Sequence, residues 1–441
     1  MLPEVSSFGE QVIAAETRWD AAAALLRAWS ARPAGTPVRR GGDGFLELVD
    51  EVRAHFDARP DTLELDDVDR GEILRWTAAG ADLQRVDAVG FGLSFSASAG
   101  FAQAWRERLG EGIHRPAVGD VFPAADAPWP ATRGGAARTP SPGSMAIDED
   151  DHPHARVVRE DMLPVAFDFR LWRPLRAIGL GLETIAAITV NEDLAELGLD
   201  PPAPSAYPAR LADEAEQGRR VLAQLEVAIA EGAQIVVLPE LATTPGIVER
   251  VRARLDEDEE QRLVVCGSWH APDPEDGRPA NRSVGLVSGV GARMEHRKIA
   301  EFGDLYPRDP DARRREGIAA PEAPLLRVHV ADQFRFALVI CKDFLHPPVT
   351  RTLDRLGANV LLVPALSRKV QPFAARAHAH VADAQAVSVV ANGPRAWLGE
   401  PVVPTALIAR PYAPRDVIQA TAGAAPSVVL FSLRGEPARG L

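Results

Sequence analysis

The chain has 441 residues, of which 46% are hydrophobic and 25% are charged, and its formal net charge is −13. This composition is typical of a globular protein, and the length favours two domains over one. The negative charge argues against a nucleic-acid backbone or an anionic membrane as the main partner, because both are bound through clustered positive charge. A small molecule is the ligand that such a chain is expected to bind.

The cysteine content and the N-terminus bear on the compartment. Two cysteines, Cys266 and Cys341, are too few for a disulfide framework and indicate a reducing environment. The first residues show no signal-peptide pattern, and no apolar stretch approaches the roughly 18 residues that a membrane helix needs. We therefore expect a cytoplasmic protein.

The N-terminal part, residues 1–115, is expected to form a mainly helical domain of unknown role. Apolar residues spaced three and four apart predict helices over 10–29, 45–56 and 63–79, with turn residues between them. Residues 116–165 are rich in Pro, Gly and Ala and then acidic, which predicts a linker.

Residues 166–441 alternate helical and strand-like patterns, which is typical of a layered α/β domain. One unit occurs twice, over 211–240 and 349–365: an amphipathic helix, a glycine suited to the left-handed position, and a short apolar strand stopped by proline. The repeat predicts that both strands end at the same sheet edge. Two packed helix–strand halves fit a four-layer α-β-β-α sandwich, although the local pattern also allows a doubly wound sheet.

Three side chains with complementary chemistry follow strand-like segments. Cys341 follows a buried apolar strand, Glu240 follows the strand that ends at a proline, and Lys298 ends a polar strand. A thiol needs a base to become a nucleophile, and a carboxylate can take its proton and later activate water. An ammonium can hold the oxyanion that forms when sulfur attacks carbon.

Each of these residues also has a purely structural interpretation. Cys341 alone suits a buried thiol, Glu240 a helix N-cap and Lys298 a solvated strand residue. Cys266 lies inside an apolar strand and is expected to belong to the core. The joint presence of the three groups favours the catalytic interpretation.

The segments around these residues resemble the motifs of the nitrilase (carbon–nitrogen hydrolase) superfamily. The glutamate motif resembles residues 237–241, the lysine motif 296–299 and the cysteine motif 339–343, with 351–364 continuing the match. Two flanking strands of the family resemble residues 281–287 and 387–392. The resemblance covers residues 183–435, and three motifs in the right order are a specific signal.

The resemblance implies that residues 166–441 form a nitrilase-like sandwich with Glu240 as general base, Lys298 as oxyanion stabiliser and Cys341 as nucleophile. It also implies hydrolysis of a non-peptide C–N bond of an amide, carbamoyl group or nitrile through a cysteine thioester, with no metal or organic cofactor. Many members carry a second acidic residue downstream of the lysine, for which Glu301 and Asp304 are the candidates. Pairing of such proteins through the helices beside the cysteine makes a homodimer one alternative.

Departures from the family pattern keep other functions open. Lys342 adds a cation beside the cysteine and is expected to lower its pKa. Residues 380–385 differ from the family's corresponding helix, and residues 1–165 match nothing in the family. These features motivate two alternatives: a catalytically modified sensor or assembly module that recruits a protein partner through its N-terminal domain, or an acyl or ammonia transferase.

Overall fold

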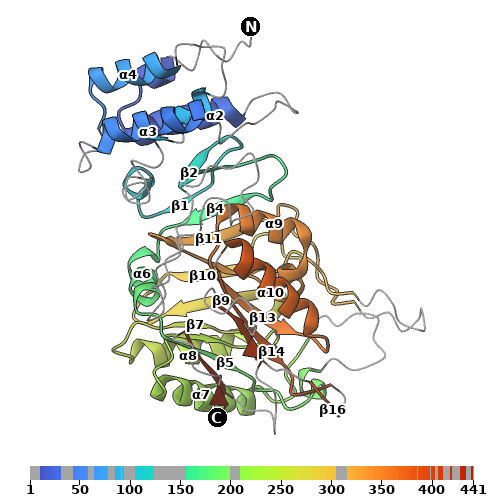
Figure 1. Cartoon of the computed structure of the whole chain (residues 1–441). Coiled ribbons are helices and arrows are strands. Elements are labelled where there is room, and N and C mark those ends of the chain that lie inside the picture. The colour runs from blue at the N-terminus through green and yellow to red at the C-terminus, as the bar shows by residue number, and fades with distance from the viewer. Residues whose placement is uncertain are drawn as a thin grey trace. The chain divides into compact units, whose positions relative to one another are not determined.

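The structure is a computed structural model of the chain (Figure 1). It describes residues 10–30, 43–57, 64–77, 85–90, 92–93, 105–123, 155–198, 209–303, 315–384, 386–397, 399–402, 406–410, 418–419, 428–433 and 439–440. The described residues divide into two compact units. A helical unit comprises those up to residue 162 except 111–115, and an α/β unit comprises 111–115 and those from 163 onward.

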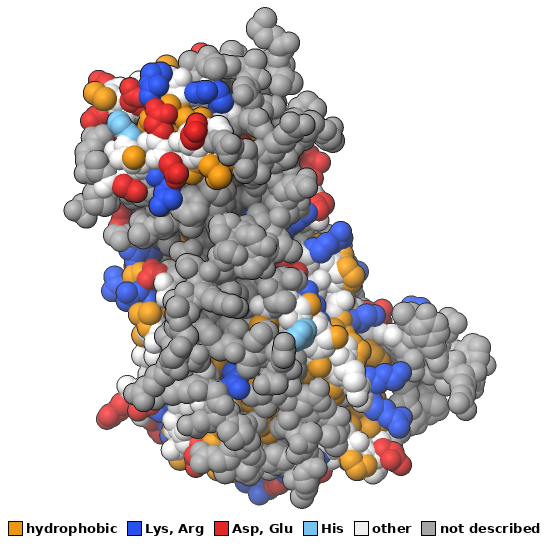
Figure 2. All heavy atoms as spheres, viewed as in Figure 1, with side chains coloured by type: hydrophobic (Ala, Val, Ile, Leu, Met, Phe, Trp, Pro, Cys, Tyr) orange, Lys and Arg blue, Asp and Glu red, His pale blue; other side chains and the backbone are white. Residues whose placement is uncertain are grey.

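The helical unit contains helices α2 (Arg18–Ser30), α3 (Asp43–Asp57) and α4 (Asp67–Thr77), and a ladder of β2 (Val121–Pro123) with β3 (Ala155–Val157). Their apolar faces share one core that includes Phe56 and Trp76. On the face that Figure 2 shows, acidic, basic and hydrophobic side chains of this unit are interspersed. The segment predicted as a linker therefore contributes two paired strands within the described residues.

The first sheet of the α/β unit mixes parallel and antiparallel strands. Its order is β1 (Ile113–His114), β4 (Val165–Asp168), β11 (Leu326–Ala331), β12 (Phe334–Leu338), β13 (Val360–Leu366), β14 (Val387–Gly393), β17 (Ala406–Ala409) and β18 (Ile418–Gln419). The ladders β12–β13 and β13–β14 are parallel.

The second sheet has a similar parallel centre, formed by the β5–β6 and β6–β7 ladders. Its order is β10 (Arg293–Arg297), β9 (Pro279–Val287), β7 (Leu263–Val265), β6 (Ile235–Val237), β5 (Thr184–Ile188), β19 (Val428–Ser432) and β20 (Arg439–Gly440), and β8 (Trp269–Pro272) pairs with β9. A separate two-stranded ladder joins β15 (Ala396–Trp397) and β16 (Glu400–Pro401).

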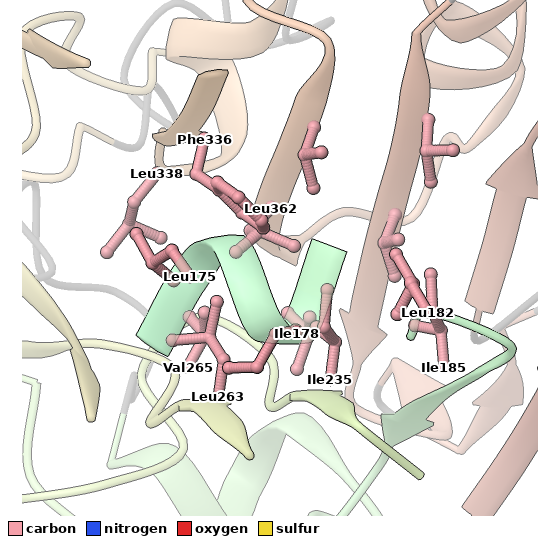
Figure 3. Packing of buried hydrophobic residues seen from close by; sticks show 14 of the residues in the cluster. Leu175, Ile178, Leu182, Ile185, Ile235, Leu263, Val265, Phe336, Leu338 and Leu362 are labelled. Carbon is pink, nitrogen blue, oxygen red and sulfur yellow. The ribbon is translucent and has the colours of Figure 1, made fainter. Parts of the chain in front are cut away.

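One apolar core joins the facing sides of the two sheets. Side chains of β6 and β7, such as Ile235 and Val265, pack with Phe336 and Leu362 of the first sheet, and helix α6 (Trp172–Leu180) adds Leu175 (Figure 3). Alternate residues along each strand point to opposite faces, so β5, β6 and β7 of the second sheet also contribute to a second core on their outer side. This burial of both faces explains why these central strands are apolar.

Helices α7 (Glu214–Ala230) and α8 (Pro245–Asp256) cover the outer face of the second sheet. Asp213 and Thr244 cap their first turns by accepting backbone N–H groups. Two short helices are η1 (Leu194–Leu197), which precedes α7, and η3 (Cys341–Leu345), which precedes α9 (Pro347–Leu356). Helix α10 (Gln371–Ala384) packs on β14 and β17. Among the described residues, none of the helices has the length and apolar character that a membrane crossing requires.

The prediction of a mixed α/β domain is confirmed, but one detail of the repeat differs. Strands β6 and β13 lie in different sheets and do not share a sheet edge. Local pattern does not specify which sheet a strand joins, because that depends on its long-range partners. The segment after β6 still meets the end of β13, since the Glu240 amide donates to the Ala365 carbonyl at 3.3 Å.

A buried histidine in the first sheet predicts a pH dependence of stability. His329 of β11 lies opposite Asp168 of β4, and burial lowers the pKa of His329 from 6.5 to about 4. As the pH falls from 6.5 towards 4, His329 becomes protonated in the unfolded chain but stays neutral in the folded chain. The free energy of unfolding therefore falls. For one group this slope is at most about 1.4 kcal/mol per pH unit.

We expect His329→Gln to flatten this loss in urea unfolding measured between pH 6.5 and 4. The exposed His378 is the matched control, and His378→Gln should keep the wild-type slope. An equal slope in all three proteins would contradict the assignment.

Candidate active site

The three predicted residues converge in the α/β unit. Glu240 follows β6, Lys298 follows β10 and Cys341 begins η3, and their exposed fractions are 4%, 1% and 3%. The Lys298 ammonium lies 2.6 Å from Glu240 Oε1, the Cys341 thiol donates a hydrogen bond to the Leu366 carbonyl at 3.8 Å, and the charge of Glu240 acts on the thiol. A thiol, a carboxylate and an ammonium are therefore gathered in one buried cluster.

A fourth ionisable residue, Glu316, completes the cluster, and the sequence did not identify it. Glu316 Oε2 lies 2.6 Å from Lys298 Nζ. Of the two acidic residues that were candidates for such a role, Glu301 accepts a hydrogen bond from the Gly317 amide, and Asp304 lies outside the described residues. The Glu316 amide donates to the Phe302 carbonyl and the Phe302 amide donates to Glu316 Oε2, each at 3.0 Å, which places Glu316 beside the lysine segment although 18 residues separate Glu316 from Lys298.

Neutral side chains hold the two carboxylates in place. Asn281 Nδ2 donates to Glu240 Oε1 at 2.8 Å and to Glu316 Oε1 at 2.7 Å. His270 Nδ1 accepts the Ala209 amide, which leaves its Nε2–H to donate to Glu316 Oε1 at 3.3 Å. The sequence did point to Asn281, because this residue begins the segment 281–287 that resembles a strand of the nitrilase superfamily. The resemblance did not assign a role to it.

Burial and the local charges shift the pKa values of Glu240 and Glu316 in opposite directions. Burial raises the pKa of Glu240, the charge of Lys298 opposes this, and the charge of Glu316 adds to it. Burial also tends to raise the pKa of Glu316, but the charge of Lys298 and the donors His270 and Asn281 outweigh burial, so its pKa is lowered. Pairs of carboxyl groups with divergent pKa values are typical of acid–base sites.

The cation and the thiol respond to the same surroundings. Burial favours neutral Lys298, but Glu240 and Glu316 outweigh it and raise the pKa of Lys298 well above its usual value. Burial, followed by the charge of Glu240, raises the pKa of Cys341, so the resting group is a thiol. The expectation that the lysine beside the cysteine lowers this pKa is wrong as a net outcome. Lys342 donates its Nζ–H to the Glu301 carbonyl at 3.1 Å instead.

A carboxylate two residues after the cysteine ties the catalytic segments together. Asp343 accepts the amides of Ile299 and Ala300, at 3.1 and 2.7 Å, and its Oδ2 lies 2.7 Å from His296 Nε2. The lysine segment is thus bound to the cysteine turn. Cys341 itself has a φ of 48°, a left-handed conformation that non-glycine residues adopt rarely and that concentrates at functional sites.

The second cysteine has no such surroundings. Cys266 is a buried member of the core beneath α7 and α8, as predicted, and burial raises its pKa to about 12. Within the described part of the chain, no group of three or more His, Cys, Asp or Glu side chains is arranged to hold a metal ion.

The comparisons with known proteins give structural similarities. No protein-family model and no curated protein matches the chain. An amidase from Nesterenkonia sp. is similar at 16% identity and a TM-score of 0.42, covering 57% of this chain and 90% of its own. Saccharomyces cerevisiae Nit3, a member of branch 10 of the nitrilase superfamily, is similar at 17% identity and a TM-score of 0.39, and the match covers 57% of this chain and 89% of Nit3. A mutant of the Nesterenkonia amidase in complex with butyramide is similar at 17% identity and a TM-score of 0.42, and the match covers 57% of this chain and 91% of the amidase.

The contact between Glu240 and Cys341 predicts a shift in thiol reactivity. Because the Glu240 charge raises the pKa of Cys341, we expect Glu240→Gln to lower that pKa. Labelling of Cys341 by iodoacetamide, followed across pH by mass spectrometry, should then have its midpoint at lower pH. Cys266 is an internal control whose profile should not move, and an unchanged or higher midpoint at Cys341 would argue against the contact.

Proposed function

We propose that the chain is a thiol-dependent hydrolase that cleaves a non-peptide C–N bond of a small molecule, with Cys341 as nucleophile. The α/β unit would correspond to a four-layer α-β-β-α sandwich of the nitrilase type. The observation that carries the proposal is the contact of Glu240 with Lys298 in a buried cluster that also holds the Cys341 thiol, on which the charge of Glu240 acts. Burial strengthens each of these electrostatic interactions relative to water.

In the first half-reaction, Glu240 takes the thiol proton as Cys341 Sγ attacks the carbonyl carbon. The Lys298 ammonium donates a hydrogen bond to the oxyanion of the tetrahedral intermediate. Glu240 then gives its proton to the leaving nitrogen, the C–N bond breaks, and a thioester and an amine or ammonia result. The raised pKa of Glu240 suits a group that must hold a proton between these two steps.

In the second half-reaction, Glu240 takes a proton from water, and the hydroxide attacks the thioester carbonyl. Lys298 again stabilises the oxyanion. The C–S bond breaks, the thiolate regains the proton from Glu240, and the carboxylic acid leaves. Both half-reactions use Glu240 as the base and Lys298 as the cation, so no further ionisable group is needed for the second one.

An amide or carbamoyl group is the substrate class that we place before a nitrile. Its leaving nitrogen needs a proton in the first half-reaction, and Glu240 holds one at that stage. The addition of a thiol to a nitrile releases no nitrogen at this step. Glu316, Asn281 and His270 act as positioning residues, because they contact the charged groups Lys298 and Glu240 directly or through one another.

The decisive measurement is ammonia release from a panel of simple amides, carbamoyl compounds and nitriles by the full chain. We expect turnover with at least one amide, a covalent acyl adduct on Cys341 by mass spectrometry, and loss of turnover in Cys341→Ala. Cys266→Ala, the matched control, should retain it.

Other outcomes point to the alternative functions. Absence of turnover and of any adduct on Cys341 would refute the hydrolase and favour a sensor or assembly module that works through the helical unit. Formation of a hydroxamate at the expense of the acid, when hydroxylamine is added, would favour acyl transfer.

The charge of Glu316 is expected to affect the pH at which kcat/KM falls on the acidic side of its pH profile. Because this charge raises the pKa of Glu240, Glu316→Gln should lower the pKa of the base, and activity should persist to lower pH. The maximal rate should fall, since Lys298 loses one of its two carboxylate contacts. The exposed Glu322 provides a control, and Glu322→Gln should leave the limb in place.

A further inference from the structure

A cavity of about 290 Å³ lies in the α/β unit where the β8–β9 hairpin and β10 approach the segment before β11. Its volume is at the small end of ligand pockets. The lining residues that bear on its chemistry are Arg282, Arg297, Arg327, Glu275 and His296. None of the catalytic cluster, Glu240, Lys298, Cys341 or Glu316, is among the residues that line it.

Strand geometry separates this cavity from the catalytic cluster. Arg282 and Arg297 lie opposite each other in the β9–β10 ladder, and their chain neighbours are Asn281, which contacts Glu240, and Lys298. Successive side chains of a strand point to opposite faces. The two arginines therefore point away from Asn281 and Lys298, and the cavity is completed by Glu295 and His296 of β10.

Most charges that line the cavity are already paired. Arg297 contacts Asp273 at 3.3 Å and Asp276 at 2.9 Å, and Arg327 contacts Glu295 at 3.3 Å. The remaining acid, Glu322, contacts Arg278 at 3.3 Å.

Within the part of the chain that the structure describes, the two lining side chains left without an ion pair have opposite signs: Arg282 and Glu275. A ligand with one carboxylate and one ammonium complements this pair of charges.

Two arginines of the cavity face each other across the ladder. Arg282 and Arg297 lie directly opposite each other, and like charges in such a pair are destabilising. A bound carboxylate would reduce this cost, because guanidinium groups bind carboxylates through paired hydrogen bonds.

We propose that this cavity is a binding site for a small zwitterion of the amino-acid class, in which Arg282 binds the carboxylate and Glu275 the ammonium. Such a ligand would also lie against His296, whose other contact, Asp343, holds the amides that follow Lys298. The site is distinct from the one that Cys341 serves, and the proposal does not depend on the proposed hydrolase activity.

The test is calorimetric titration of the full chain with the natural α-amino acids, and with acetate and methylamine as the separate halves. We expect at least one amino acid to bind, and acetate and methylamine to bind at least about tenfold more weakly. Arg282→Gln should weaken amino-acid binding at least about tenfold, and Arg282→Lys by less, because lysine keeps the charge but not the paired donors. Glu275→Gln should weaken the amino acid but not acetate.

Two controls keep the result specific. Arg219→Gln, an equal charge change on the exposed surface of α7, should leave binding unchanged. Cys341→Ser should also leave it unchanged, because the catalytic cluster lies on the other face of the ladder. Thermal unfolding of each variant verifies that it is folded.

The proposal is overturned if no amino acid binds, if folded Arg282→Gln binds like wild type, or if acetate alone binds as well as the amino acid. Loss of binding in Cys341→Ser would overturn it too, since the ligand would then occupy the catalytic site. None of these results depends on whether the chain hydrolyses an amide.

Discussion

The buried ammonium of Lys298 is the constraint on which the site depends. A lone ammonium in this position would lose its charge, because desolvation disfavours the ionised form. Two carboxylates, Glu240 and Glu316, each 2.6 Å away, keep it ionised, and the group of three then carries an excess negative charge. Burial and the charge of Glu316 raise the pKa of Glu240, so Glu240 is the carboxyl group that accepts a proton more readily, and its charge acts on the Cys341 thiol.

The two-sheet architecture supplies this cluster from distant parts of the chain. Glu240 and Lys298 follow strands of the second sheet, whereas Cys341 follows a strand of the first. The sheets share one apolar core, so their strand ends are held in a fixed relation. Asp343 adds a polar tie between the lysine segment and the cysteine turn. Catalytic geometry and core packing are therefore parts of the same arrangement.

The β9–β10 ladder connects the two sites that the α/β unit presents. One face carries Asn281 and Lys298, whose polar groups contact the buried carboxylates Glu240 and Glu316. The other face carries Arg282 and Arg297, where the pairing of charges is incomplete. His296 lines the cavity and is bonded to Asp343, which also accepts the amides that follow Lys298.

The sequence by itself determined the mixed α/β character, because strand and helix periodicity are local properties, and its motifs singled out Glu240, Lys298 and Cys341 as a group whose chemistry is complementary. It did not reveal Glu316, which reaches Lys298 only through the closure of a loop. Nor did it reveal that β6 and β13 belong to different sheets, or that the pKa of Cys341 is raised despite the adjacent Lys342. Tertiary structure decided these features, since strand partners, burial and the direction of a side chain depend on contacts between residues far apart in the chain.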